Sequence, residues 1–143
     1  MAITGPSVVP LQRRFEAIAS DMKRALLFNL AEEARTQVVK GFEAERDPYG
    51  APWPARKSRP RRGRQGGKLL QDTRRLMNSI NPRPAGDSIR FDTNVAYAKV
   101  HNYGGKHTPK RQFLPDVGNG FGPIWTAAFQ RVAEKLMERA VRR

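Results

Sequence analysis

The sequence predicts an α+β fold, because helical and strand patterns both occur in it, in separate segments. Apolar residues recur every three or four positions over residues 7–41 and again over 123–143, which is the period of one helix face. Between them, residues 88–93 alternate polar and apolar side chains, as half-buried strands do. We therefore expect a long N-terminal helix, a short middle helix and a C-terminal helix, packed on a small antiparallel sheet with extended loops rich in Pro, Gly and Arg.

The length and composition favour one domain with a modest core. The chain has 143 residues, an ordinary size for one domain and small for two. Apolar residues make up 38% of it, below the roughly 45–50% of a typical globular chain. Its 11 prolines and 12 glycines gather in the middle and indicate long irregular stretches. Such segments often become ordered only against a partner, which favours an assembly subunit over a self-sufficient monomer.

Residues 7–41 are predicted to form one long helix. Ser7 can cap its start, Pro10 is tolerated in the first turn, and Gly41 is a natural end. A helix of about 30 residues would span about 45 Å, so its far end is expected to reach beyond the core toward a neighbour. Its apolar face consists of Leu11, Phe15, Ile18, Met22, Leu26, Leu30, Ala34 and Val38.

Residues 42–68 are predicted to form an extended arm and a basic loop. Asp47-Pro48-Tyr49-Gly50 is typical of a turn. Ala51-Pro52-Trp53-Pro54 is expected to be extended, because a residue that precedes proline avoids the helical region. Arg56–Lys68 contains no acidic residue and is expected to be a mobile loop in the free protein.

Residues 69–116 are predicted to combine the short helix with the sheet. The helix is expected over Leu69–Ile80, ended by Asn81-Pro82-Arg83-Pro84. Residues 88–93 are the predicted strand, whereas Val95–Tyr103 fits a strand or a short helix equally well. The C-terminal helix over 123–143 has an apolar stripe of Trp125, Ala128, Phe129, Val132, Leu136, Met137 and Ala140.

The charge of the chain is strongly positive. It carries 27 Lys and Arg against 13 Asp and Glu, a formal charge of +14, which attracts nucleic acid, acidic protein surfaces or anionic membranes. The densest basic stretch contains Arg56, Lys57, Arg59, Arg61, Arg62 and Arg64. We expect it to lie against DNA phosphates or against an acidic neighbour in an assembly. Trp53, beside this stretch, is a candidate for either the core or an interface.

The sequence offers no convincing active site, and we expect neither a cofactor, a metal nor a small-molecule substrate. It contains no cysteine and no apolar run of membrane-spanning length, and residues 1–10 lack the charged start and apolar run expected of a signal peptide. The glycines of residues 63–68 lack the spacing and the Ser or Thr of a phosphate-binding loop. His101 and His107 do not share a helix face, as the two histidines of a metal site on a helix would. A catalytic triad could be drawn from Ser79 or Ser88 with His101 and Asp92, but neither serine lies in the strained turn typical of a nucleophile.

Residues spread over most of the chain match the pattern of one known family in order and spacing. Those at the end of the first helix and in the short helix are Phe42, Leu70, Thr73, Leu76, Ser79 and Ile80. The others are Asp47, Pro48, Tyr49, Gly50, Trp53, Pro54, Thr93, Asn94, Tyr97, Ala98, Val100, His101, Gly104, Gly105, Pro109, Lys110, Arg111, Gln112, Phe113, Leu114 and Pro115. Through these residues the chain resembles the virion-morphogenesis family of tailed bacteriophages, which includes the phage Mu tail-completion type, from about Leu11 to Arg139. Arg74 departs from the pattern where the family often has glycine, and arginines crowd the stretch after Trp53 where the family has threonine and scattered lysines.

The resemblance implies a non-enzymatic virion component that acts late in morphogenesis, at the tail or at the neck between tail and head. It implies partners of three kinds: copies of the chain in a ring, other neck, connector or tail proteins, and packaged double-stranded DNA if the arginine loop meets it. The protein would be assembled in the bacterial host cytoplasm. Two alternatives remain at this point: a basic nucleic-acid-binding protein without enzymatic activity, and a nuclease that uses His101.

Overall fold

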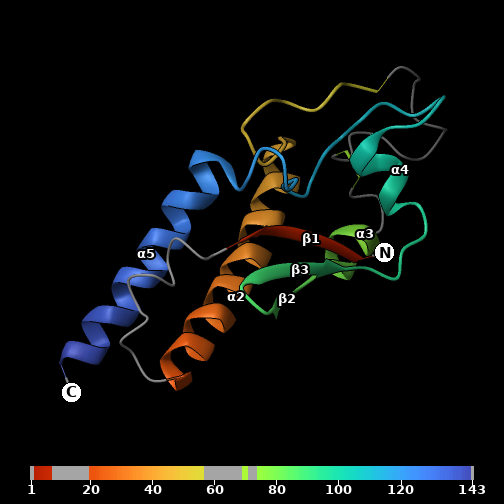
Figure 1. Cartoon of the computed structure of the whole chain (residues 1–143). Coiled ribbons are helices and arrows are strands. Elements are labelled where there is room, and N and C mark those ends of the chain that lie inside the picture. Colours follow the sequence, from red (N-terminus) through yellow and green to blue (C-terminus); the bar gives the residue numbers. More distant parts are fainter. Residues whose placement is uncertain (1, 8–19, 57–68, 71–73, 143) are drawn as a thin grey trace.

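A computed structural model describes residues 2–7, 20–56, 69–70 and 74–142 of the chain (Figure 1). Helix α2 contacts α5, β2 and β3, and Figure 1 shows α2 and α5 side by side with the strands crossing α2. Helices and a small antiparallel sheet thus occur in separate segments, and the predicted α+β class is confirmed. The elements are β1 (Ala2–Ser7), α2 (Ser20–Ala44), α3 (Arg75–Ser79), β2 (Asn81–Ala85), β3 (Ser88–Asp92), α4 (Ala98–Tyr103) and α5 (Gly122–Val141).

Helix α2 is the longest element and supplies one wall of the core. Leu26, Leu30, Ala34 and Val38, which the helical period placed on one face, are all buried. Met22 is half-buried, and Leu11, Phe15 and Ile18 lie outside the described residues. Burial of this face against α5 and the sheet holds the helix, because propensity alone rarely stabilises an isolated helix.

The predicted bounds of this helix are wrong at both ends. Ser7 lies in β1 rather than at a helix start, and the helix continues past Gly41 to Ala44. It ends where Glu45 takes a left-handed φ of 54°, and the Arg46 N–H donates back to the Gly41 carbonyl at 3.0 Å. A Cβ on Gly41 would lie 3.3 Å from the Arg46 carbonyl oxygen, so the glycine makes room for the returning chain.

The sheet has three antiparallel strands in the order β1-β3-β2, and the prolines follow this order. Central β3 was predicted and contains no proline, so every N–H group is available to the ladder. The outer strands contain Pro6 in β1, and Pro82 and Pro84 in β2, positions that the sheet edge tolerates. The segment from Asn81 was predicted only to end a helix, and it forms β2 instead.

Strand β1 lies unusually close to β3 at Gly5. A Cβ at this position would lie 2.8 Å from the Ile89 carbonyl oxygen and 3.1 Å from the Phe91 ring. The register of the two strands is also irregular between Thr4 and Ser7. The absence of a side chain at Gly5 therefore allows the first strand to cover β3.

Helix α3 is shorter than the sequence predicted, whereas α5 is close to its predicted length. α3 occupies only Arg75–Ser79, because Leu70 and Arg74 take left-handed φ values of 59° and 55° that interrupt a helix. The undecided segment is helical in α4. Helix α5 begins at Gly122 and buries Trp125 and Phe129, as predicted.

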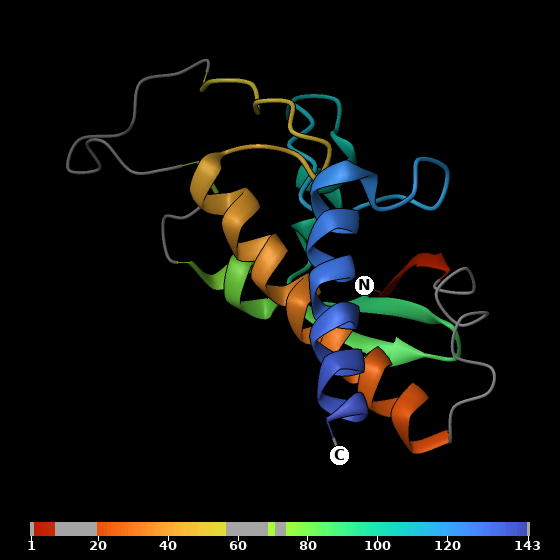
Figure 2. The same ribbon diagram turned by 90° about the vertical axis from the view of Figure 1, so that its left-hand side faces the viewer.

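The core joins two groups of aromatic rings. Phe42 at the end of α2 packs edge-on against Trp53 and at a tilt against Phe113, with ring centroids 5.3 Å apart in both pairs. Trp125 contacts Phe91, which connects α5 to the sheet. Figure 2 shows α5 in front of α2, with the strands to one side. The first aromatic group positions the loops of the candidate site.

Candidate interaction site

A tight turn follows α2. The Asp47 carboxylate Oδ1 accepts hydrogen bonds from the N–H groups of Tyr49, at 2.8 Å, and Ala51, at 2.9 Å. The Asp47 N–H donates to the Ala51 carbonyl at 2.8 Å. Gly50 has a φ of 96°, a conformation that favours glycine. The predicted turn is thus present, and we call residues 46–56 the arm.

Two side chains attach the arm to a segment far away in the sequence. The Trp53 indole N–H donates to the Gln112 carbonyl at 2.7 Å. The Arg111 guanidinium donates to the carbonyls of Pro54, at 2.9 Å, and Ala55, at 3.3 Å. These bonds satisfy backbone acceptors of an irregular segment, which would otherwise require water. The arm is therefore fixed by residues 111–112.

Tyr49 makes a third attachment at the other end of the arm. Its hydroxyl donates to the Gly120 carbonyl at 2.8 Å and accepts from the Asp116 N–H at 3.0 Å. Burial raises the pKa of the Tyr49 hydroxyl above its ordinary value, and the nearby Asp116 carboxylate adds to this. The hydroxyl therefore remains protonated and serves as both donor and acceptor.

Arg111 is a buried cation, with 7% of its surface exposed. Burial lowers the pKa of its guanidinium, Arg56 lowers it further, and Glu45 acts in the opposite direction. An arginine nevertheless keeps its charge in proteins. Arg111 and Arg56 therefore place two positive charges near each other at the end of the arm.

Asn102 holds the same segment from the side of α4. It is 1% exposed, and its Oδ1 accepts from the N–H groups of Phe113, at 3.0 Å, and Leu114, at 3.1 Å. It shares the buried face of α4 with Ala98. The sequence-based prediction missed Asn102, although its position four residues after Ala98, on the same helix face, was an available signal.

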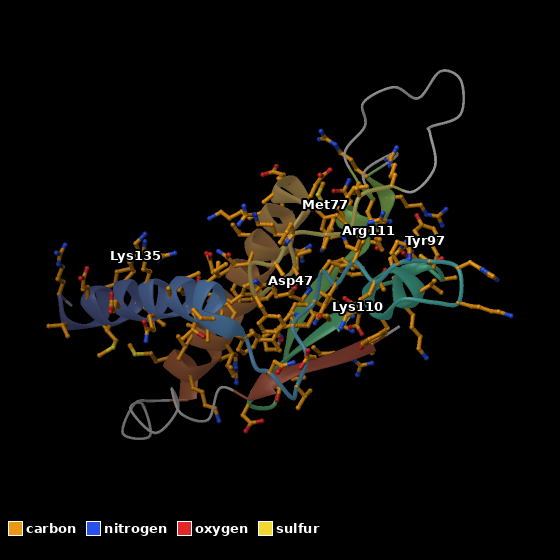
Figure 3. All side chains as sticks on the ribbon, turned by 90° about the horizontal axis from the view of Figure 1, so that it is seen from above. Asp47, Met77, Tyr97, Lys110, Arg111 and Lys135 are labelled. Carbon is orange, nitrogen blue, oxygen red and sulfur yellow. The ribbon has the colours of Figure 1, made fainter. Side chains whose placement is uncertain are left out.

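His101 belongs to α4 and lies beside Arg111. Its carbonyl accepts from the Arg111 N–H at 2.8 Å, and its ring packs edge-on against Tyr97. Figure 3 shows Arg111 and Tyr97 close together beside α4. Burial, and then the charge of Arg111, lower the pKa of the imidazole below its ordinary value, so the ring is neutral near pH 7.

A short loop follows α4 and folds back on it. Gly104 has a φ of 81°, and a Cβ there would lie 3.2 Å from Lys110 Cβ. The N–H groups of Gly105 and Thr108 donate to each other's carbonyls, at 2.9 and 3.3 Å. This pairing sets Lys106 at the tip of the loop, where it is exposed.

The predicted site residues divide into four groups. Asp47, Pro48 and Gly50 form the turn after α2. Tyr97 directly precedes α4, and the residues of α4 and of the segment after it are Ala98, His101, Gly104, Gly105, Pro109, Arg111, Phe113 and Leu114. Arg56 is exposed at the end of the arm, whereas Lys57, Arg59, Arg61, Arg62 and Arg64 lie outside the described residues. Trp53, for which the sequence left the core and an interface equally open, is 7% exposed and packs on Phe42, so it belongs to the core.

The residues weighed for enzymatic chemistry have other partners. The Ser79 hydroxyl donates to the Leu76 carbonyl, and Arg83 and Arg90 pair with the Asp92 carboxylate. Within residues 2–7, 20–56, 69–70 and 74–142, no cluster of three His, Cys, Asp or Glu side chains could hold a metal ion. Nor does any described helix have the length and apolar character needed to cross a membrane.

Comparison with known protein families identifies the chain. Residues 8–124 match the model of the phage virion morphogenesis family, which is most of the 143 residues. The chain therefore belongs to the phage virion morphogenesis family. This membership indicates a structural or assembly role in a bacteriophage virion. Neither the curated proteins nor the solved structures contain a significant match.

Proposed function

We propose that the chain is a tail-completion or head–tail joining subunit that assembles with copies of itself into a ring at the neck of the virion. The observation that carries the proposal is the extent of the family match. It covers the arm, α4 and residues 111–116, which are the segments that buried and partly buried hydrogen bonds connect. A framework of this kind presents loops in a fixed arrangement, as an assembly subunit requires.

Features of the surface support a ring. A closed ring needs two different surfaces on each copy that fit each other head to tail. Phe28 on α2, with 59% exposed, and Met137 on α5, with 44% exposed, are large apolar side chains on separate elements. An apolar groove of about 150 Å³ between the end of α2 and the start of α5 is lined by Gly41, Ala44, Pro48, Phe113 and Ile124, among others. Such features are candidates for the two sides of a copy–copy contact.

The position of the subunit is tested by complementing a phage that lacks this protein. We expect unjoined or DNA-leaking heads and tails without it, and intact particles when the chain is supplied. Normal infectious particles in its absence would overturn the proposal. Light scattering of the purified chain tests self-assembly separately, and a strict monomer at all concentrations would contradict the ring.

The arginine stretch, as a part of this proposal, faces the DNA channel or a neighbouring ring. Replacing Arg56, Arg59, Arg61 and Arg62 with glutamine tests this, because glutamine keeps the side chain polar and removes the charge. The matched control replaces three cations of α5, Arg131, Lys135 and Arg139, and Arg142, which directly follows the helix. We expect the first variant alone to lose joining or DNA retention, and normal particles with both would contradict the assignment.

A basic nucleic-acid-binding protein without enzymatic activity is the second candidate, and the formal charge of +14 favours it. It predicts that the purified chain binds DNA tightly as a monomer, with affinity that falls steeply as salt rises. It also predicts that virions assemble normally without the chain. The complementation assay separates the two candidates.

A further inference from the structure

The exposed surface of α4 and of the loop after it has an unusual composition. Tyr97, Val100 and Tyr103 recur every three residues and are 42–48% exposed, on the side of α4 opposite buried Ala98 and Asn102. No Asp or Glu occurs from Thr93 to Pro115. Exposed lysines and exposed tyrosines thus share one segment of the chain that contains no carboxylate. We call this surface the α4 outer face, and its members are Tyr97, Lys99, Val100, Tyr103, Lys106 and Lys110.

We propose that the α4 outer face binds the phosphate backbone of double-stranded DNA, together with Arg56 at the end of the arm. This inference rests on the proposed function, because DNA would pass through the ring at the neck. Lysines neutralise phosphates and release counterions, and tyrosine hydroxyls donate to phosphate oxygens without reading the base sequence.

The fold holds these groups in place. Asn102 fixes α4 to residues 113–114, and the paired Gly105 and Thr108 shape the loop that carries Lys106. Arg111, whose N–H donates to the His101 carbonyl of α4, also binds the carbonyls of Pro54 and Ala55, which holds the end of the arm just before Arg56. A preorganised set of donors loses less conformational entropy on binding than a flexible one.

Charge favours DNA over a second copy as the occupant. Each copy has a formal charge of +14, and exposed carboxylates such as Glu134 and Glu138 alternate with cations on α5. Two copies would therefore bring like charges together at this face. Two carboxylates lie near the α4 outer face. Asp116 lies near Lys110 but accepts hydrogen bonds from Asn119 and Gln112, and Glu45 lies near Arg111. A polyanion fits the remaining excess of positive charge.

Fluorescence anisotropy with a labelled DNA duplex, at several salt concentrations, tests the inference on the full chain. The variant is K99Q/K106Q/K110Q, and the matched control R131Q/K135Q/R139Q removes the same charge from exposed positions of α5. Each lysine on a phosphate contributes about 0.9 to the slope of log affinity against log salt. We expect the α4 variant to reduce the slope by about 2–3 and the control by less than about 1.

Three results would overturn the inference. The first is an equal reduction of the slope by both variants, which would mean that net charge alone binds DNA. The second is tighter binding of single-stranded DNA than of a duplex of the same length, which would indicate stacking on Tyr97 and Tyr103. The third is an α4 variant that keeps the wild-type slope but no longer self-assembles in light scattering, which would make this face a copy–copy contact. A wild-type monomer would contradict only the ring, since the slope comparison does not depend on assembly.

Discussion

Trp53 and Gln112 are 59 residues apart in the sequence, yet the indole N–H of the first lies 2.7 Å from the carbonyl oxygen of the second. The bond is buried, and the Trp53 ring packs edge-on against Phe42 at the end of α2. One side chain therefore connects the longest helix, the arm and the segment that follows α4. It makes the framework of the candidate site part of the core.

Trp53→Phe is expected to destabilise the fold without abolishing it. Phenylalanine keeps an aromatic ring but leaves the Gln112 carbonyl without its buried donor and leaves a small cavity. We expect the free energy of unfolding to fall by about 2–4 kcal/mol, measured by chemical denaturation. Val117→Ala, at a position with 67% exposure, is the control and should change it by less than about 0.5 kcal/mol. Equal effects would contradict the assigned role of Trp53.

Asn102→Ala removes the acceptor for two buried N–H groups. Each of the two groups left unsatisfied costs about 1–3 kcal/mol, so we expect a loss of about 2–6 kcal/mol in unfolding free energy. Hydrogen exchange at Phe113 and Leu114 should also become faster, because these N–H groups lose their partner. Asn78→Ala, an exposed position on α3, is the control. Unchanged exchange at both residues would show that Asn102 does not hold this segment.

Gly5→Ala tests the close approach of β1 to β3. The added Cβ would lie 2.8 Å from the Ile89 carbonyl oxygen, so the strand must shift. We expect a loss of about 1–3 kcal/mol in thermal or chemical unfolding. At Gly118 an added Cβ has only an ordinary contact, 3.5 Å from the Asp116 carboxylate, and Gly118→Ala should be nearly neutral. A neutral Gly5→Ala would mean that β1 does not pair as described.

His101 is expected to make folding depend on pH. Its pKa in the folded chain is below the ordinary 6.5, so the unfolded chain takes up the proton first as the pH falls. The stability that the neutral His101 ring contributes is fully present above pH 6.5. It is lost as the pH falls toward the lower pKa that His101 has in the folded chain. The carboxyls of Asp92 and Asp116 change the stability only near and below pH 3.8, because their pKa values in the folded chain are lowered from 3.8.

Melting temperatures at about pH 7.5 and about pH 5.5 test this effect. His101→Gln should show a smaller loss of melting temperature between the two than the wild type. His107→Gln, at an exposed position, should behave as the wild type does. The effect would be assigned to the wrong residue if His107→Gln alone flattened the pH dependence.

The sequence predicts those elements whose signal is local. Leu26, Leu30, Ala34 and Val38 repeat at helical spacing and form the buried face of α2. Alternation of Ile89 and Phe91 with polar neighbours predicts β3. Strands β1 and β2 were missed because Gly5, Pro6, Pro82 and Pro84 resemble breakers, and their tolerance at sheet edges depends on the strand order.

The candidate site was predictable in its parts and not in its connections. The turn around Asp47 follows from local chemistry, since the side chain, proline and glycine all favour it. The bonds from Trp53 to Gln112 and from Arg111 to Pro54 join residues more than fifty positions apart, and no local pattern encodes them. The core position of Trp53 therefore became evident only from the tertiary structure.

The most direct measurement is electron microscopy of phage particles with this subunit labelled and located. The account predicts several copies arranged around the tail axis at the neck, and separate heads and tails in particles made without the chain. Labelled copies absent from the virion, or complete particles without the chain, would contradict it.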